Sequence, residues 1–488
     1  MPTRIETVKI REVGQIREIK KDIAKVTGLE SCMNGQLVDI TQNSKGMIMG
    51  FVAGEIPVLL LGKTDEARVG DKVYSRMEPF KIPVGENFVG RAVNALAEPI
   101  DGKGPIEPGA HYSVFRDAPS VLERIPITET FETGVLIIDS TIPIGKGQRE
   151  LIIGDRMTGK TAICTDAIIN QKGKDIVCIY CCVGRAYSTL ERIAETLKVS
   201  GAMDYSIIVS ATASCSAGEQ YLAPYTACAL GEYFMDKGKH VFVVFDDLTK
   251  HAWIYRQISL LLERPPGREA YPGDVFYLHS QLMERAGKLS PECGGGSMTF
   301  FPIVETLQGD VTGYISSNLV SMTDGQIYLN TQLFNEGFKP AVDTGLSVSR
   351  IGNKAQCPAV RELSAMLRLE YIQYNDLLKV TRFKTGMSDE VTMRLKRGEI
   401  ITQLFLQDKN EPYPAIKEIV LLYALRKGVL DVLSRPEIED FKRRITDFVS
   451  AAYPGLFDEL SEKKDLSPEV KKQLNDCIVA FFRKKDKK

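Results

Sequence analysis

The stretch Leu151-Ile152-Ile153-Gly154-Asp155-Arg156-Met157-Thr158-Gly159-Lys160-Thr161 decides the fold of this 488-residue chain. Its first three residues predict a buried strand, and the eight residues that follow it, 162–169, predict a helix. Between them stands the pattern Gly-x-x-x-x-Gly-Lys-Thr, which in that context is a phosphate-binding loop. The backbone N–H groups of such a loop and the helix N-terminus hold phosphate oxygens. We therefore predict that all eight residues bind a nucleotide: Gly154, Asp155, Arg156, Met157, Thr158, Gly159, Lys160 and Thr161.

Two side chains of this loop are expected to act directly on the ligand. Lys160 should reach the β- and γ-phosphates, and the Thr161 hydroxyl should ligate Mg²⁺. A second apolar run, Val241-Phe242-Val243-Val244-Phe245, ends in Asp246 and Asp247. A strand that ends in a carboxylate beside a phosphate loop places that carboxylate next to the metal. Asp246 is our prediction for the acid that holds Mg²⁺ through water, with Asp247 beside it, and ATP or ADP is the expected ligand.

The chain around the loop has three patterns. Within residues 1–78, short apolar runs alternate with glycines from about Val8 to Arg76, which predicts a small β-barrel. Residues 79–352 alternate apolar strands with helical stretches, which predicts an α/β nucleotide-binding domain. In residues 353–488 the strands stop, and apolar side chains recur every three or four residues. The two clearest series predict helices of an all-α bundle broken at prolines: Val360, Leu363, Leu367, Tyr371, Tyr374 and Leu378, then Ile438, Phe441, Ile445 and Phe448.

Composition excludes some classes of function. Lys and Arg number 62 and Asp and Glu 63, so no overall charge favours nucleic acid or an anionic membrane. No apolar run reaches the roughly 20 residues that span a bilayer. Any membrane association should be indirect, and no nucleic-acid partner is expected. Ten cysteines are present, and the pair Cys178-x-x-Cys181 lies in an apolar run, so we interpret it as buried core rather than a metal site.

Five motifs, in order along the chain, carry a specific resemblance. They are residues 99–105 (Pro-Ile-Asp-Gly-Lys-Gly-Pro), residues 142–150 (Ile-Pro-Ile-Gly-Lys-Gly-Gln-Arg-Glu), the phosphate loop, residues 265–276 (Pro-Pro-Gly-Arg-Glu-Ala-Tyr-Pro-Gly-Asp-Val-Phe) and residues 345–350 (Gly-Leu-Ser-Val-Ser-Arg). The chain resembles the family of F-type ATP synthase α subunits from about Ile23 to its end. The resemblance implies a β-barrel, a RecA-like P-loop domain and a helical domain. It also implies a non-catalytic, regulatory subunit in a ring of three α and three β subunits around a γ shaft.

The same resemblance implies a place and a catalytic contribution. The complex would couple ATP synthesis or hydrolysis to proton or sodium transport, on the cytoplasmic side of a bacterial plasma membrane. Arg350 matches the arginine that α subunits lend to the adjacent β site, where a guanidinium stabilises charge on the γ-phosphoryl group. The alternative for Arg350 is an ordinary ion pair.

The chain also departs from the family pattern. In Cys182-Val183-Gly184-Arg185-Ala186, catalytic relatives carry a glutamate where Arg185 stands, and α subunits usually carry a glutamine. A guanidinium cannot accept a proton from water, so this chain's own site should lack a general base. Arg185 could add positive charge near the phosphates or form an ion pair. Met157 replaces a usual glutamine in the loop.

Further departures from the family pattern concern the residues that face the adenine base and the segments that would contact the peripheral stalk. Gln407 matches one of two glutamines that face the adenine, while Lys409 stands at the other position. Only about twenty residues precede the first strand expected at Ile23, and residues 289–298 are abbreviated. The contact with a δ subunit or peripheral stalk therefore stays open.

Three rival functions differ in what they require. A self-sufficient hexameric ATPase of the secretion type needs the catalytic glutamate that Arg185 replaces. An RNA-translocating P-loop motor needs stacked aromatics and basic residues in its barrel, and this barrel offers few aromatics (Phe51, Tyr74) and no basic stripe. A degenerate ring scaffold would have no use for nucleotide, yet Lys160 and Thr161 both remain.

Overall fold

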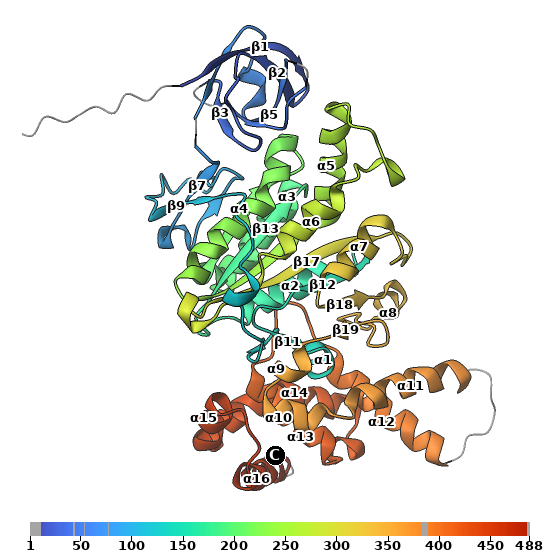
Figure 1. Cartoon of the computed structure of the whole chain (residues 1–488). Helices are drawn as coiled ribbons and strands as arrows, with labels where there is room; N and C mark the ends of the chain where they lie inside the picture. Colours follow the sequence, from blue (N-terminus) through green and yellow to red (C-terminus); the bar gives the residue numbers. More distant parts are fainter. Residues whose placement is uncertain (1–10, 42–43, 53, 77, 382–388, 486–488) are drawn as a thin grey trace, which may run out of the picture.

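The computed structural model describes residues 11–41, 44–52, 54–76, 78–381 and 389–485, which stack as three parts (Figure 1). A closed β-barrel lies at one end, a large α/β sheet in the middle and a group of helices at the other end. The predicted fold class is confirmed. Residues 1–10, which precede the barrel, lie outside the described residues. In the described part of the chain, we find no helix that is both long and apolar enough to cross a bilayer.

Six strands close the barrel, so none of them has a free edge. In the order of their pairing they are β1 (Val13–Lys20), β2 (Ile23–Thr27), β5 (Ile56–Gly62), β4 (Ser44–Ile48), β3 (Leu37–Asp39) and β6 (Lys72–Ser75). The expectation that the first strand begins at Ile23 is wrong, because β1 begins ten residues earlier. Only Gly14 and Ile16 of β1 are buried, so its apolar signal is weak. Gly14 is needed there, since a Cβ atom would lie 2.7 Å from the carbonyl oxygen of Thr27.

The central sheet has nine strands and is mostly parallel. Its order is β19 (Val348–Ser349), β18 (Gly325–Leu329), β12 (Glu150–Asp155), β17 (Ser297–Thr306), β15 (His240–Asp246), β13 (Ile176–Val183), β14 (Ser206–Ala211) and β8 (Ala92–Val93), with β16 (Gly287–Lys288) paired to β17. The pairs β18–β19 and β16–β17 are antiparallel. The predicted apolar runs are these buried strands, as parallel sheets covered on both faces require. Cys178 and Cys181 are fully buried in β13, which confirms their interpretation as core residues.

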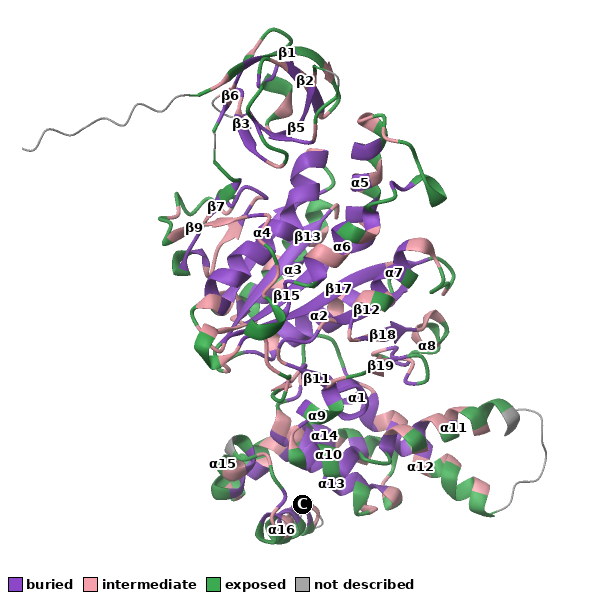
Figure 2. Ribbon diagram, in the orientation of Figure 1, coloured by how far each residue is buried: buried purple, intermediate pink, exposed green. Residues whose placement is uncertain are grey.

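Helices cover both faces of the sheet, and the faces can be told apart by the alternation along β13. Cys178, Tyr180 and Cys182 pack with α2 (Lys160–Ile169) and α3 (Tyr187–Val199). Val177, Ile179 and Cys181 pack in the cluster of α4 (Ala217–Asp236), α5 (Leu248–Leu261), α6 (Val275–Met283) and α7 (Tyr314–Met322). Helix α4 is buried along nearly its whole length (Figure 2). The inner strands are therefore buried on both faces, while Gln326 of β18 and the edge strand β19 are partly exposed.

The helical part contains α9 (Gly352–Ala355), α10 (Pro358–Ser364), α11 (Leu367–Thr381), α12 (Asp389–Phe405), α13 (Ala415–Arg426), α14 (Arg435–Ala452), α15 (Pro454–Glu462) and α16 (Pro468–Lys485). Helix α1 (Leu136–Thr141), far earlier in the chain, packs against this group. The single helix predicted through residues 360–378 is two helices, α10 and α11, separated by a turn at residues 365–366. Of its six apolar positions Leu378 alone is exposed, at 36%. The second predicted helix is α14, which begins with a capping box between Ser434 and Glu437.

Short elements complete the chain. The strands β7 (Lys81–Val84) and β9 (Ala110–Ser113) form one ribbon, and β10 (Thr130–Phe131) and β11 (Ile144–Gly145) form another. Helix α8 (Thr331–Asn335) follows β18. The 3-10 helices are η1 (Thr64–Glu66), η2 (Glu86–Phe88), η3 (Val121–Glu123), η4 (Ala202–Tyr205), η5 (Arg268–Ala270), η6 (Pro291–Cys293) and η7 (Val429–Val432).

Candidate nucleotide site

The phosphate loop joins the carboxyl end of β12 to the N-terminus of α2. Gly154 is required by close packing, because a Cβ atom there would lie 2.6 Å from the carbonyl oxygen of Leu329. Gly159 caps α2 in the left-handed region, with φ of 99°. Met157 also has a positive φ, 63°, and its side chain is 88% exposed. The loop therefore presents its backbone, with the start of a ten-residue helix behind it, as an anion site requires.

The side chain of Asp155 holds this loop in place. Its Oδ1 accepts hydrogen bonds from the Thr306 hydroxyl (2.7 Å) and the Gly309 N–H (2.8 Å), and its Oδ2 accepts one from the Thr331 hydroxyl (2.7 Å). Burial alone would raise the pKa of Asp155, but these hydrogen bonds lower it. Asp155 thus ties the loop to the end of β17 and the start of α8, while any contribution to phosphate binding would come from its backbone.

Lys160 and Thr161 lie at the start of α2 with their functional atoms in fixed positions. Lys160 is 4% exposed, and its Nζ donates to the carbonyl oxygens of Gly154 (2.8 Å) and Asp155 (2.5 Å). Burial, together with the nearby Arg185, lowers the pKa of Lys160. The Thr161 hydroxyl donates to Oδ2 of Asp246 at 2.8 Å. Two residues predicted to share one metal, 85 positions apart in sequence, are therefore in contact.

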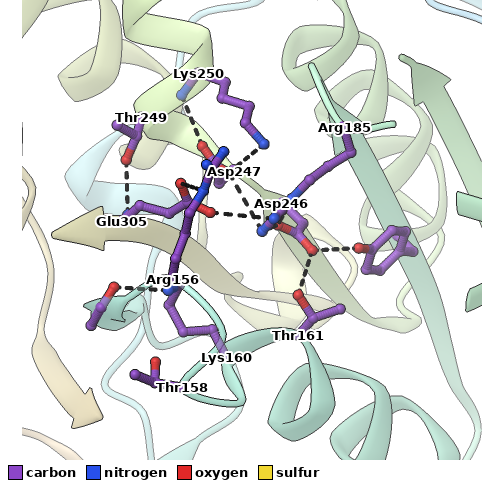
Figure 3. Close-up of polar contacts among 12 residues, drawn as sticks. Arg156, Thr158, Lys160, Thr161, Arg185, Asp246, Asp247, Thr249, Lys250 and Glu305 are labelled. Carbon is purple, nitrogen blue, oxygen red and sulfur yellow. Dashed lines mark hydrogen bonds and ion pairs between the residues drawn. The ribbon is translucent and has the colours of Figure 1, made fainter. Parts of the chain in front are cut away.

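Asp246 stands at the centre of a buried polar cluster (Figure 3). Its carboxylate is fully buried, and Oδ2 also accepts a hydrogen bond from the Tyr180 hydroxyl at 2.6 Å. Oδ1 accepts hydrogen bonds from Nε (2.8 Å) and Nη2 of Arg185. Arg185 therefore forms an ion pair, and it also lines the cavity beside the loop. Tyr180 was missed from the sequence, because its hydroxyl meets Asp246 only through the pairing of β13 with β15.

Asp247 and Glu305 complete the cluster. Asp247 accepts the Lys250 N–H at 2.8 Å as the cap of α5, and its Oδ2 lies 3.4 Å from the ammonium of Lys250 and 3.5 Å from Arg185. Burial raises the pKa of Asp247 to about 6, with the neighbouring carboxylates adding to the effect and the cations opposing it. Glu305 ends the apolar stretch of β17, and its oxygens lie 3.3 Å from Arg185 and 3.4 Å from Arg156. Glu305 was missed, although it follows an apolar run as Asp246 does.

The oxygen donors at this site suit a hard cation. Mg²⁺ prefers oxygen ligands and is usually held by one or two carboxylates together with substrate phosphates. Thr161 and Asp246 supply such oxygens. No three Asp, Glu, His or Cys side chains converge into a metal cluster within the described residues, so Mg²⁺ here would depend on the phosphates for further ligands. The residues fit the ion, with Asp246 already paired to Arg185.

A cavity of about 790 Å³ opens beside the loop, a volume in the range of small-ligand sites. Its far wall includes Phe334, Pro340 and the residues 407–410. Gln407 lies there but its amide is bound to backbone. Nε2 donates to the carbonyls of Gly134 and Glu411, both at 2.8 Å, and Oε1 accepts the Leu136 N–H at 3.2 Å. A contact of Gln407 with the base stays a prediction.

Asp166 links that wall to α2. Its Oδ1 accepts the Asn410 N–H at 2.7 Å. Burial raises the pKa of Asp166 to about 7, and the hydrogen bond opposes the shift. Asp166 also lines the cavity, and no feature of the sequence singled it out. Lys409 lies on the same wall.

Arg350 lies at the opposite end of the sheet. In the register of β12, β18 and β19, Glu150 pairs with Gly325, and Gly325 pairs with Ser349. Arg350 is therefore at the amino end of β12, roughly 16 Å along the strand from the loop at its carboxyl end. It is exposed and makes no hydrogen bond or ion pair through its guanidinium with any described residue, although its charge acts on buried Glu150. Arg350 cannot serve its own loop.

Comparisons with known proteins agree with this geometry. The model of the ATP synthase alpha/beta family, nucleotide-binding domain, matches residues 134–349. The model of the ATP synthase alpha/beta chain, C terminal domain, matches residues 356–481. The chain is 47% identical over 479 residues to ATP synthase subunit alpha of Clostridium botulinum strain Hall, which covers 98% of this chain and 94% of that one. It is 46% identical over 474 residues to the protein of the same name from strain Eklund 17B, with 97% and 94% covered.

Proposed function

Because this chain belongs to the ATP synthase alpha/beta family and matches alpha subunits over nearly its whole length, we propose that it binds Mg-ATP without hydrolysing it and lends Arg350 to a neighbouring subunit. Membership places the chain in a complex with other ATP synthase subunits. The partners we propose are β and γ subunits, in a ring attached peripherally to the cytoplasmic side of the membrane. There the complex couples ATP synthesis or hydrolysis to ion transport.

The observation that carries the non-catalytic assignment is the ion pair of Arg185 with Asp246. Hydrolysis needs a group that orients the attacking water and accepts its proton. The guanidinium at position 185 has no acceptor. The nearby carboxylates of Asp246, Asp247 and Glu305 are each paired with a cation. Because each carboxylate is held by its cationic partner, none of the three is free to act as the general base for water.

The loop residues have distinct parts in nucleotide binding. The backbone of residues 154–159 and the start of α2 provide N–H donors for phosphate oxygens. Lys160 adds a buried positive charge, and it would exchange its present carbonyl partners for phosphate oxygens. Thr161 and Asp246, the latter through water, would hold Mg²⁺, which neutralises phosphate charge when bound. Asp247 caps α5 beside them, and Gln407 stands on the wall where the base would lie.

Two observations support the proposed role of Arg350 in a neighbouring subunit. Its exposure, and its distance from its own phosphate loop, leave the side chain available to a neighbour. In the catalytic site of an adjacent β subunit, a guanidinium would stabilise the charge that develops on the γ-phosphoryl group. The planar fork of arginine suits this task better than the ammonium of lysine.

The test is Arg350→Ala in a complex reconstituted with β and γ subunits. Multisite ATP hydrolysis should fall on the order of 10³-fold, while ATP binding to the isolated variant should match the wild type. Lys354→Ala removes another exposed cation four residues away and should leave turnover unchanged. Normal turnover by the Arg350 variant would refute the role in trans. ATP hydrolysis by the purified chain alone, at tens of turnovers per second, would instead support the self-sufficient ATPase.

A further inference from the structure

The guanidinium of Arg185 lies among three carboxylates behind the phosphate loop (Figure 3). Its Nε is 2.8 Å from Asp246 Oδ1, its Nη1 is 3.3 Å from Glu305 Oε1, and its Nη2 is 3.5 Å from Asp247 Oδ2. The Arg185 side chain is 17% exposed, Glu305 8%, and the two aspartates are fully buried. A permanently charged group thus lies beside the carboxylate that is expected to hold a divalent cation.

Both oxygens of Asp246 are already in use. Oδ2 accepts hydrogen bonds from Thr161 and Tyr180, and Oδ1 accepts hydrogen bonds from Arg185. A hydrated cation approaching Asp246 would meet a carboxylate whose charge is neutralised by a guanidinium that does not lose its proton. The attraction of this site for a divalent ion is therefore weaker than that of an unpaired aspartate.

The charges of the site balance without a metal. Asp246, Asp247 and Glu305 face Arg185, Lys160 and Lys250, and the exposed Arg156 adds one more cation beside Glu305. With a neutral residue at position 185, the carboxylates would repel the phosphates of a nucleotide unless a divalent ion lay between them. Arg185 itself lines the cavity with Lys160, so its charge acts on the same side as the phosphates.

We propose that Arg185 is an internal cation of this nucleotide site, and that it frees ATP binding by this chain from most of its dependence on Mg²⁺. The inference rests on the proposed function, since it assumes that residues 154–161 hold the phosphates. It concerns binding and does not assign a catalytic role to Arg185.

The experiment measures ATP binding to the full-length chain by equilibrium dialysis, once in excess Mg²⁺ and once in EDTA. For the wild type the two dissociation constants should agree within about threefold. Arg185→Gln should raise the ratio of the EDTA value to the Mg²⁺ value at least tenfold, about the effect of one hydrogen bond to a charged group. The matched control is Arg443→Gln, which removes an exposed arginine of α14 that does not line the cavity. It should keep the wild-type ratio.

The outcomes separate the inference from the proposed function. Wild-type binding that is lost in EDTA would overturn the inference and leave the proposed function standing. Absence of ATP binding in both conditions would overturn both. Arg185→Gln leaves buried carboxylates with fewer partners, so its fold is checked by circular dichroism, and the wild-type comparison decides the matter if the variant does not fold. Arg185→Lys keeps a positive charge and should show a ratio below that of the glutamine variant, and an equal ratio would overturn the inference.

Discussion

The buried pair of Arg285 and Glu232 gives the sharpest prediction about stability. Arg285 follows α6 and is 1% exposed, as is Glu232 on α4. Nε and Nη2 of Arg285 donate to the two carboxylate oxygens at 2.7 and 2.8 Å, and Nη1 donates to the carbonyl oxygen of Val114 at 2.8 Å. Arg285→Met removes all three hydrogen bonds and leaves a buried carboxylate without its counter-charge.

The structure sets the size of the effect. Breaking one partner of a buried ion pair costs about 3–5 kcal/mol, because the remaining charge stays desolvated. Replacing both partners with apolar residues removes that penalty. We therefore expect Arg285→Met to lose about 4 kcal/mol of unfolding free energy, and Arg285→Met/Glu232→Leu to recover at least half of the loss.

Urea unfolding, followed by tryptophan fluorescence, measures the unfolding free energy with a probe close to this ion pair. Trp253 is the single tryptophan of the chain and lies on α5, which packs against α4. The control is Lys20→Met, which breaks the exposed pair with Glu263 (3.4 Å) and should change stability by less than about 1 kcal/mol. The reasoning is refuted if Arg285→Met loses less than about 1 kcal/mol, or if the double variant is no more stable than the single one.

Three further perturbations test other parts of the structure. Lys160→Ala should abolish ATP retention through gel filtration with only a mild effect on turnover of the complex; retained nucleotide would count against the loop assignment. Burial raises the pKa of Asp166 to about 7 from 3.8, so the folded state holds a proton that the unfolded state releases. The contribution of protonated Asp166 is full below about pH 4 and is lost as the pH rises through 7, so the unfolding free energy of the wild type should fall by up to about 1.4 kcal/mol per pH unit between about pH 4 and 7. Asp166→Asn should remove this slope, and identical profiles for the two proteins would contradict this. Gly147 has a φ of +100°, and a Cβ there would lie 2.8 Å from the Gly287 backbone, so Gly147→Ala should lower the unfolding free energy by more than about 2 kcal/mol. Gly173 has a φ of +76° with open space around it, so Gly173→Ala should lower it by only about 1 kcal/mol. Equal losses would show that packing at Gly147 adds nothing.

The strands of the central sheet that the sequence predicted are those whose burial is uniform. Strands such as β13 and β15 are continuous apolar runs because helices cover both of their faces, so they could be read without knowing the sheet order. Strand β1 alternates a few buried residues with polar ones, and it was missed. The turn between α10 and α11 contains Ala365 and Met366, which carry no helix-breaking signal, so one helix was predicted where two exist.

Some features of the nucleotide site were predicted from the sequence and others were not. That Thr161 and Asp246 belong to one site was foreseen, because a phosphate loop is expected beside a strand that ends in a carboxylate. The partners of Arg185 were not, since they depend on β13, β15 and β17 being neighbours in the sheet. Spacing along the chain leaves that order open, so Tyr180 was missed, and Glu305 was missed although it follows an apolar run.

The phosphate loop and Arg350 lie at opposite ends of the same paired strands, so a rotation of the sheet about one end displaces the other end. Strands β12 and β18 are buried and paired along their length, so the two ends move together. A rotation of about 5° about the loop would displace the backbone at Arg350 by roughly 1.4 Å over its 16 Å arm. A misplacement of about 1 Å can change a rate by about 10²-fold. A small tilt that leaves the chain's own nucleotide in place would thus be enough to change a rate that depends on Arg350, if Arg350 acts in a neighbouring subunit as proposed.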